Sequence, residues 1–381
     1  MVAVLAVTQT VGYGVLYYAF AVFITPISAD LHTDTAHVSA ALTISVLLEA
    51  GAAIPVGRWL DRHGGRALMT AGSAVGVVAV VAWSQVRTVG QLYAVFVLIG
   101  LASAMSLYEA AFSVVIATTD PARRDSALLT VTIVAGFASS IFFPLAGWLT
   151  TTVGWRTAVL LLAALLAATA FPGHLVAVPT AHAHREHGTV RTGARLSEAL
   201  RDTGFWLLSL AFVLHTAAIS AVGVLLVTFL RHAGHTTTVA ATLAGLLGIL
   251  SVTGRVVTTA LARRHGMPTV TAAVFAVQAV GAAALPHLGH SIAGVAACVV
   301  AFGLGFGIGW LARPAIVAAR YGTARYASIA GAMALPTTLA RALAPLGAAL
   351  LPPGWFLTAA GIACFTAAAL LMGVRGRPTS E

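Results

Sequence analysis

The stretch Gly57-Arg58-Trp59-Leu60-Asp61-Arg62-His63-Gly64-Gly65-Arg66 joins two long apolar segments. Apolar residues run almost without a break from Val38 to Val56, and they resume at Ala67. Charges that are confined between long apolar segments are typical of a loop at the edge of a membrane. The stretch therefore predicts that both flanking segments are membrane-spanning helices.

The composition of the whole chain supports this interpretation. Of the 381 residues, 59% are hydrophobic and only 8% are charged, too few charges to cover a soluble globule of this size. The net charge of +10 comes from arginines that lie singly or in pairs between apolar blocks, so it does not indicate a nucleic-acid-binding face. The chain contains no lysine and much alanine, which indicates a high-GC bacterial genome.

Apolar blocks of about 20 residues, the length that crosses a bilayer, recur along the chain and predict twelve spans. Their limits are 2–28, 37–58, 67–86, 90–118, 126–151, 154–175, 204–230, 236–261, 267–286, 290–318, 326–350 and 354–374. The longest polar stretch, Pro179 to Thr203, follows the sixth span. We therefore expect three regions: residues 1–175 as a first six-helix bundle, 176–203 as a cytoplasmic central loop, and 204–381 as a second six-helix bundle.

The arginines also predict the orientation of the chain, because basic residues gather on the cytoplasmic side of a membrane. With a cytoplasmic N-terminus, the outer loops contain only Arg87, Arg156 and Arg231. The inner loops and tail contain fifteen: Arg58, Arg62, Arg66, Arg123, Arg124, Arg185, Arg191, Arg195, Arg201, Arg263, Arg264, Arg320, Arg325, Arg375 and Arg377. We expect a multi-pass protein of the plasma membrane, the inner membrane of a bacterial cell, with both termini in the cytoplasm.

The two halves share a short repeat. Arg62-His63-Gly64 follows the second span, and Arg264-His265-Gly266 follows the eighth. The second copy is degraded, because Arg263 stands where Asp61 would be. Together with the equal number of spans in each half, this repeat indicates two related six-helix bundles.

The charged stretch after the second span resembles the loop G-x-x-x-D-R-x-G-R-R of the major facilitator superfamily. Gly57, Asp61, Arg62, Gly64 and Arg66 match that loop, while Gly65 replaces the first arginine of its closing pair. The resemblance implies an all-α membrane protein with twelve transmembrane helices in two pseudo-symmetric six-helix bundles. It also implies a substrate path at the pseudo-twofold axis between them.

The resemblance implies a role for these five residues as a cytoplasmic gate. In the family, the aspartate accepts hydrogen bonds from the N-terminal amides of a helix in the opposite bundle and pairs with arginine. Asp61 would be the acceptor, with Arg62 and Arg66 as charged neighbours, and Gly57 and Gly64 would allow close approach and a tight turn. A simple anchor at the membrane edge would explain the arginines but not the aspartate.

The subgroup of the family stays open between drug or metabolite exporters and monocarboxylate or oxalate/formate-like carriers. Pro144 and Gly147 resemble the antiporter signature of the exporters, but Phe143 and Phe96 stand where that group has a glycine and an arginine. Gly12-Tyr13-Gly14 in the first span is more similar to the carriers.

Ionisable residues inside spans are costly and therefore candidates for function. Glu49 in the second span and Glu109 in the fourth are candidates for proton coupling, because a desolvated carboxyl can exchange a proton near neutral pH. His215 in the seventh span is a third candidate. Each has an alternative interpretation as a neutral, hydrogen-bonded group that serves only packing.

Other polar and aromatic residues are candidates for the substrate cavity. Arg313 follows Trp310 by three residues, so the two share a helix face, and Arg341 lies deep in the eleventh span. These arginines can bind an anion, pair with the glutamates or form structural salt bridges. Further cavity candidates are Gln9, Tyr13, Tyr17 and Tyr108, although some of these tyrosines also fit an interfacial aromatic belt.

The residues predict a transporter and not an enzyme. A phosphate-binding loop G-x-x-x-x-G-K-[ST] would need a lysine, which the chain lacks, and we expect no cofactor. His182, His184 and His187 fit a solvated linker better than a metal site. The sequence thus predicts a secondary transporter that moves a small organic solute by alternating access.

We expect proton coupling, with export of a metabolite or drug slightly favoured over uptake. The alternative is an organic anion or monocarboxylate carrier, and a remote one is a membrane receptor that transports nothing. The expected partners are the lipid bilayer, a small-molecule substrate and protons, and no nucleic acid. We expect a functional monomer.

Overall fold

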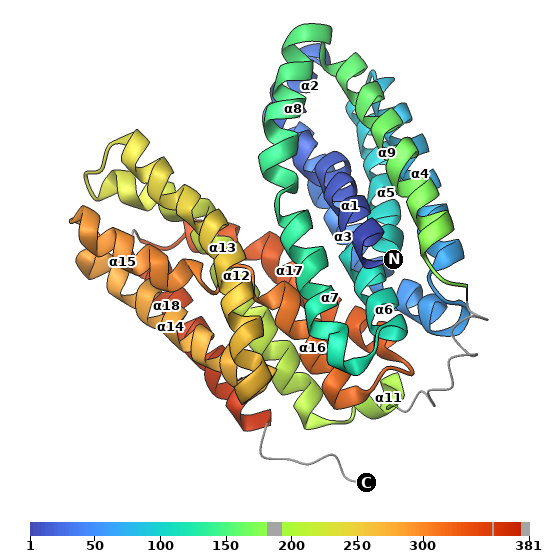
Figure 1. Ribbon diagram of the computed structural model, residues 1–381. Helices are drawn as coiled ribbons and strands as arrows, with labels where there is room; N and C mark the ends of the chain where they lie inside the picture. Colours follow the sequence, from blue (N-terminus) through green and yellow to red (C-terminus); the bar gives the residue numbers. More distant parts are fainter. Residues whose placement is uncertain (181–192, 353, 375–381) are drawn as a thin grey trace. The chain divides into compact units, whose positions relative to one another are not determined.

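The computed structural model of the chain consists almost entirely of helices (Figure 1). The structure describes residues 1–180, 193–352 and 354–374. In these ranges the β-pairing is a single isolated bridge between Gly193 and Gly322. Eleven helical segments within the described residues are long and apolar enough to cross a membrane. The predicted fold class, an all-α membrane protein, is confirmed.

The chain divides into two compact units. The first contains Met1–Ala194 together with Gly322–Leu335, and the second contains Arg195–Tyr321 together with Pro336–Glu381. One helix, α17 (Tyr326–Ala349), begins in the first unit and continues into the second. The first turns of this helix therefore pack with residues that come from the other half of the sequence.

The first unit is built from the blue to green helices of Figure 1 together with the first turns of α17. Several of these helices are joined end to end within one predicted span. The elements are α1 (Val2–Tyr13), the π-helical turn η1 (Gly14–Tyr18), α2 (Ala19–Asp30), α3 (Thr35–His63), α4 (Arg66–Ser84), α5 (Val89–Ser106), α6 (Tyr108–Thr118), α7 (Pro121–Gly136), α8 (Ala138–Val153) and α9 (Trp155–Ala177).

The second unit is built from the helices that follow, together with the later part of α17. The elements are α11 (Leu196–Ala199), α12 (Thr203–His232), α13 (Thr237–His265), α14 (Met267–Leu288), α15 (Ile292–Gly303), α16 (Gly309–Tyr321) and α18 (Trp355–Val374).

The predicted tenth span, 290–318, is not one continuous helix. It consists of α15 and α16 with a non-helical break at 304–308, and neither part has the length of a full span. Glycines alternate through this stretch at Gly303, Gly305, Gly307 and Gly309, and glycine is the weakest helix former after proline. A Cβ atom on Gly305 would lie 2.0 Å from the side chain of Gln278. The break is therefore packed closely against α14.

Short polar signals define the ends of the helices. Asp34 begins α3 by accepting a hydrogen bond from the backbone N–H of His37 at 2.7 Å. Gly64 and Gly266 end α3 and α13, two helices of 29 residues each, with φ values of +76° and +78° that favour glycine. The repeated Arg-His-Gly thus has the same local structure in both copies.

Each unit has its own apolar core. In the first unit, the ring of Phe96 is fully buried, with its centroid 4.6 Å from that of Phe20 and 5.3 Å from that of Trp83. Phe96, in this aromatic cluster, stands where the drug or metabolite exporters have an arginine. In the second unit, α14 and α12 pack against α18 around Phe302 and Leu357.

Candidate functional site

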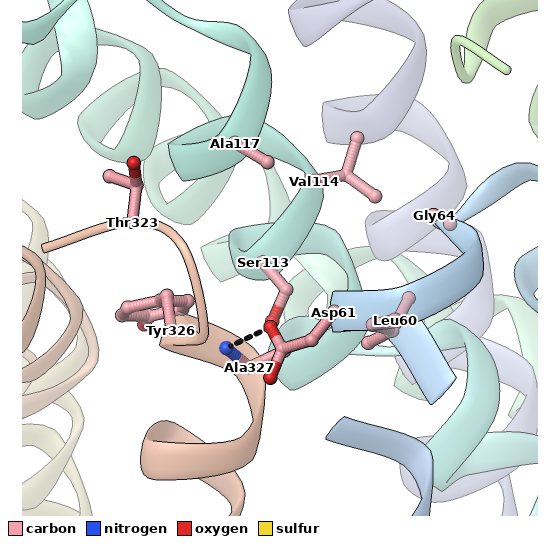
Figure 2. Close-up of a pocket in the computed structure, with 10 residues that line it drawn as sticks. Leu60, Asp61, Gly64, Ser113, Val114, Ala117, Thr323, Tyr326 and Ala327 are labelled. Carbon is pink, nitrogen blue, oxygen red and sulfur yellow. Dashed lines mark hydrogen bonds between the residues drawn. The ribbon is translucent and has the colours of Figure 1, made fainter. Parts of the chain in front are cut away.

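Asp61, one residue of the predicted gate, lies near the end of α3 and contacts the first turn of α17. Its Oδ1 atom accepts a hydrogen bond from the backbone N–H of Ala327 at 3.0 Å, and its Oδ2 atom accepts one from the N–H of Ser328 at 2.9 Å. The hydroxyl of Ser328 donates a further short hydrogen bond to Oδ2. Figure 2 shows the carboxylate facing Ala327. A carboxylate at a helix N-terminus satisfies free N–H groups and is stabilised by the helix dipole.

Two glycines allow α3 and the beginning of α17 to approach this closely. A Cβ atom on Gly57 would lie 2.3 Å from the backbone oxygen of Ala327, and one on Gly331 would lie 2.4 Å from that of Ala53. Any larger side chain at either position would push the helices apart. Gly57 therefore serves the contact that Asp61 makes one turn later.

The turn after Asp61 completes the gate motif. Gly64 provides the positive φ that ends α3, and Gly65 is buried against Val114 of α6. A Cβ atom on Gly65 would lie 2.3 Å from the Cγ2 atom of Val114, so the arginine of the family pattern would not fit here without a shift. Arg62 is exposed, and Arg66 is half-buried.

A small pocket adjoins the Asp61 contact (Figure 2). Residues of α3, α6 and the start of α17 line it, among them Asp61, Ser113, Ala117, Thr323 and Tyr326. All of these residues belong to the first compact unit.

The predicted cavity residues of the first unit lie at, or contact, irregular points of the spanning helices. Gln9 is fully buried, and its Nε2 atom donates to the backbone oxygen of Ser106 at 2.8 Å, where α5 ends. Tyr108 begins α6, and its ring centroid lies 4.5 Å from that of Tyr13. Tyr17 is part of the π-helical turn η1. Such turns are frequent at functional sites.

The two predicted carboxylates differ in their local positions. Glu49 is half-buried in the middle of α3. Glu109 is half-buried in the first turn of α6, directly after Tyr108, where the positive end of the helix dipole favours an acidic side chain. The break after Ser106 therefore gives Glu109 a position that an uninterrupted fourth span would not provide.

The structure brings together three of the cavity residues predicted for the second unit. The guanidinium carbons of Arg313 and Arg341 lie 5.7 Å and 5.5 Å from the ring centroid of Trp310. Arg313 is 7% exposed and donates from Nη1 to the hydroxyl of Thr337 at 3.0 Å. We name Trp310, Arg313, Thr337 and Arg341 the arginine–tryptophan cluster.

His215 lies in the core of the second unit, beside the break in the tenth span. Its Nε2 atom lies 3.0 Å from the Oε1 atom of Gln278, and its ring stacks on Phe275 at a centroid distance of 3.8 Å. Gln278 also donates to the backbone oxygen of Phe302 at 2.9 Å. Arg255 is 7% exposed and donates from Nε to the oxygen of Gly307 at 3.1 Å. Backbone acceptors freed by the break are thus satisfied by side chains of α13 and α14.

Gln278 was not among the residues predicted from the sequence to have a functional or structural role. The available signal was an amide side chain inside an apolar span. Its partner, the backbone oxygen of Phe302 near the end of α15, can be identified only when the break in the tenth span is known. Arg255 was not singled out either, although it lies within the predicted eighth span, 236–261.

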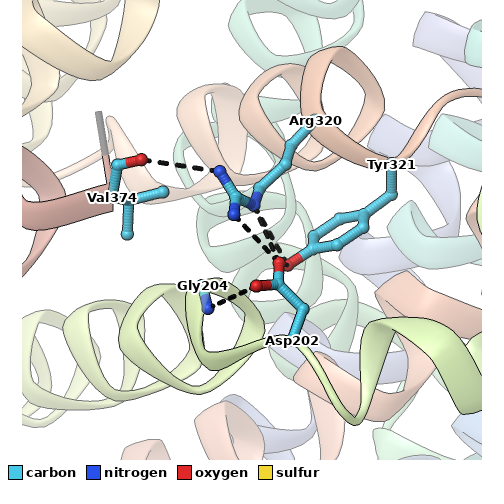
Figure 3. A network of polar contacts seen from close by, with 5 residues as sticks. All are labelled: Asp202, Gly204, Arg320, Tyr321 and Val374. Carbon is cyan, nitrogen blue, oxygen red and sulfur yellow. Dashed lines mark hydrogen bonds and ion pairs between the residues drawn. The ribbon is translucent and has the colours of Figure 1, made fainter. Parts of the chain in front are cut away.

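A second polar network, also missed from the sequence, joins α12, α16 and α18 (Figure 3). Asp202 precedes α12 and accepts from the Nη2 atom of Arg320 at 3.0 Å and from the hydroxyl of Tyr321 at 2.7 Å. It also accepts from the N–H of Gly204, and Arg320 reaches the backbone oxygen of Val374. Asp202 could have attracted attention as the last acidic residue before Glu381.

The charge of Asp202 is stabilised by this network. Burial alone would raise the pKa of the carboxyl, but the hydrogen bonds from Tyr321, Gly204 and Arg320 outweigh that effect. The pKa of Asp202 is therefore lower than its ordinary value, and the carboxylate is ionised throughout the neutral range.

His182, His184 and His187 lie outside the residues that the structure describes. Within the described part of the chain, no group of three or more His, Cys, Asp and Glu side chains is arranged to hold a metal ion.

Solved transporters share this fold. A bacterial homologue of the iron transporter ferroportin, in an outward-facing state, has a TM-score of 0.77 at 17% identity, over 99% of both chains. The Escherichia coli fucose:proton symporter FucP has a TM-score of 0.76 at 14% identity, over 100% of this chain and 98% of that one. The human organic anion transporter MFSD10 (TETRAN) has a TM-score of 0.68 at 15% identity, over 98% of both chains. None of the curated proteins matches the sequence.

Similarity at these levels of identity establishes the fold but not the substrate. The family model of the Major Facilitator Superfamily matches residues 5–345, nearly the whole chain. The gate motif, the spanning helices and this match agree, and they confirm a transporter rather than an enzyme. The protein belongs to the major facilitator superfamily.

Proposed function

We propose that this protein is a secondary transporter that moves a small organic anion by alternating access. The observation that carries the proposal is the arginine–tryptophan cluster, in which two guanidinium groups lie over one indole ring. Guanidinium groups bind carboxylates with strong, directed hydrogen bonds, and an indole ring offers an apolar surface for the rest of an organic molecule.

The distribution of charge along the chain supports the same proposal. The sequence contains no acidic residue from Thr203 to Ser380. Negative charge near Arg313 and Arg341 must therefore come from outside this stretch, and a carboxylate substrate is one source. In a partly dry environment such an interaction is much stronger than in water.

Proton-linked export of a metabolite or drug is the second candidate. Its support is the presence of Glu49 and Glu109 in membrane-spanning helices, with Glu109 placed at the start of α6 beside Tyr108. The two candidates share the transport cycle, and they differ in the charge of the substrate. In either case we propose that the protein works as a monomer in the plasma membrane of a bacterium, with both termini in the cytoplasm.

Thermal unfolding of the purified protein with different solutes tests the anion proposal. A ligand at a hundredfold excess over its Kd stabilises a protein by about 2.7 kcal/mol, so a bound solute raises the Tm. We expect small carboxylates such as acetate, benzoate and succinate to raise it, and organic cations or neutral antibiotics of similar size to have no effect.

The role of the cluster is tested by the substitution Arg341→Gln. Hydrogen bonds to a charged group contribute about 1.5–3 kcal/mol, so the affinity for the carboxylate should fall by roughly ten- to a hundredfold. Arg231→Gln is the matched control, because it removes the same charge from an exposed position at the end of α12. If organic cations raise the Tm instead of carboxylates, and raise it equally in Arg341→Gln and Arg231→Gln, proton-linked efflux is favoured over anion transport. Specific binding without any flux in liposomes would point to a receptor.

A further inference from the structure

The last turns of α3 have a buried face, which includes the contact with α17. Ala53, Val56, Gly57 and Leu60 lie on this face and are buried. The carboxylate of Asp61 is directed to the same contact, because it accepts hydrogen bonds from the backbone of α17. The negative charge near the end of α3 is therefore committed to the contact with α17.

The opposite face of α3 is exposed over about four turns. Leu47, Gly51, Pro55, Arg58 and Arg62 are spaced by three or four residues, so they form one line along the helix. All five are exposed, and we name them the α3 strip. Because α3 is long and apolar enough to cross a membrane, a strip on its exposed face is in contact with lipid.

The α3 strip changes from apolar to positively charged at a level that Trp59 marks. Its first three residues carry no charge, and its last two are arginines. Trp59 follows Arg58 directly, is 46% exposed, and has its ring centroid 4.6 Å from that of His63. Tryptophan side chains are enriched where the hydrocarbon of a bilayer meets the headgroups. The two arginines therefore lie at the level of the headgroups.

The positive charge of the strip is not explained by the structure of α3 itself. Asp61 is the only acidic residue between Glu49 and Glu109, and its carboxylate faces α17. Within the described part of the chain, no ion pair joins Arg58 or Arg62 to another residue. A basic residue in the last turn of a helix complements the helix dipole, which accounts for Arg62 but not for Arg58, one turn earlier.

We infer that the α3 strip binds an anionic phospholipid, with the phosphate held by Arg58 and Arg62 and an acyl chain along Leu47, Gly51 and Pro55. Guanidinium groups bind phosphate oxygens through strong, directed hydrogen bonds. A Cβ atom on Gly51 would meet no other atom within 4 Å, so the middle of the strip leaves open space for a chain. In the proposed orientation the lipid belongs to the cytoplasmic leaflet, whose surface is negatively charged.

A lipid fits this strip better than a soluble phosphate does. Exposed charges attract a soluble ion only weakly, because water and salt screen them. An acyl chain adds apolar contact along the first three residues of the strip and holds the phosphate at the level of the arginines. The repeat in the second unit lacks this combination, because Ala260 and Leu261 of α13 correspond to Arg58 and Trp59.

Fluorescence quenching in bilayers tests the inference on the full-length protein. The protein is reconstituted into phosphatidylcholine with a small fraction of phosphatidylglycerol or phosphatidylcholine whose chains carry bromine, which quenches nearby indole rings. The quenching that is lost in Trp59→Phe is the signal from the strip. Each arginine near an anionic headgroup strengthens binding roughly fivefold, so we expect phosphatidylglycerol to bind there roughly twenty-fivefold more tightly than phosphatidylcholine.

The double variant Arg58→Gln/Arg62→Gln removes the charge of the strip and keeps Trp59. We expect it to bind the two lipids about equally. The matched control is Arg263→Gln/Arg264→Gln, which removes two exposed arginines from the end of α13. Its preference for phosphatidylglycerol at Trp59 should equal that of the wild-type protein, because the arginines of α3 are unchanged.

Equal quenching by the two lipids in the wild-type protein would overturn the inference without the need for a variant at either arginine. An unchanged preference in Arg58→Gln/Arg62→Gln would also overturn it, and an equal loss in the control would assign the preference to the overall positive charge of the protein. Glycerol 3-phosphate, which has the phosphate but no chains, should not displace the lipid; displacement would show a site for a soluble phosphate instead. None of these results depends on the transported solute, so the inference and the proposed function can fail separately.

Discussion

The contact between Asp61 and the first turn of α17 can be removed by the substitution Asp61→Ala. The carboxylate accepts hydrogen bonds from two backbone N–H groups and one hydroxyl, and Ala327 and Ser328 are only 4% and 5% exposed. Each buried donor that loses its partner costs about 1–3 kcal/mol. For the three donors the lower end is about 3 kcal/mol. Water that enters through the adjoining pocket recovers part of this loss, so we take about 2 kcal/mol for the whole contact.

A change of about 2 kcal/mol shifts the equilibrium between the closed and open contact by roughly thirtyfold. We expect the shift to favour the state in which the beginning of α17 has left α3, which on the proposed orientation is the inward-open state. Turnover should slow, because the closed state is populated less. Binding at the arginine–tryptophan cluster should change little, since that cluster lies in the other compact unit.

Cysteine labelling measures this shift. In a background with Cys298→Ala and Cys364→Ala, a single cysteine introduced by Thr323→Cys lines the pocket beside Asp61. The rate of reaction with a maleimide should be roughly thirtyfold higher when Asp61→Ala is added. Asp34→Ala is the control, because it removes an exposed carboxylate whose hydrogen bond and ion pair are both made locally with His37, at the start of α3. Equal labelling and equal turnover with and without Asp61 would mean that the motif is only an anchor at the membrane edge.

Three further predictions follow from single contacts. Gly57→Ala should open the same contact as Asp61→Ala and give similar labelling, because its methyl group would collide with the backbone of α17. Gly65→Arg, which restores the family pattern, should lower the Tm, and adding Val114→Ala should recover part of the loss; an unchanged Tm would show that the turn has room for a side chain. Asp202→Asn should lower the Tm by the same amount at about pH 5.5 and pH 8, since the depressed pKa keeps the carboxylate ionised over that range. The stabilisation is present above the ordinary aspartate pKa and is lost as the pH falls through the lower native pKa, so a difference in Tm that already shrinks at about pH 6 would contradict the assignment.

The sequence predicted the features that depend on local pattern. The length of the apolar blocks predicted the spans, and the tight turn expected at Gly64 agrees with the positive φ of that residue. The break at 304–308 was within reach, because four alternating glycines weaken a helix, but the same glycines also fit close packing within a continuous helix. Only the contacts with Gln278 and Arg255 distinguish the two.

Other features depend on contacts between residues far apart in the sequence. Asp61 meets Ala327 and Ser328 across more than 260 residues, and the family resemblance, not the residues themselves, suggested the type of partner. The convergence of Arg313 and Arg341 on one indole ring depends on how α16 packs against α17. Neither periodicity nor composition contains that information.

The central claim, that the protein carries an organic anion by means of the arginine–tryptophan cluster, is tested most directly by counterflow in proteoliposomes. Vesicles loaded with unlabelled benzoate and placed in labelled benzoate should accumulate label transiently with the wild-type protein and with Arg231→Gln. With Arg341→Gln the accumulation should be strongly reduced at benzoate concentrations near the Kd of the wild-type protein, because the affinity is expected to fall roughly ten- to a hundredfold. Equal accumulation by Arg341→Gln and the wild-type protein, or accumulation of a cationic solute in place of benzoate, would contradict the account.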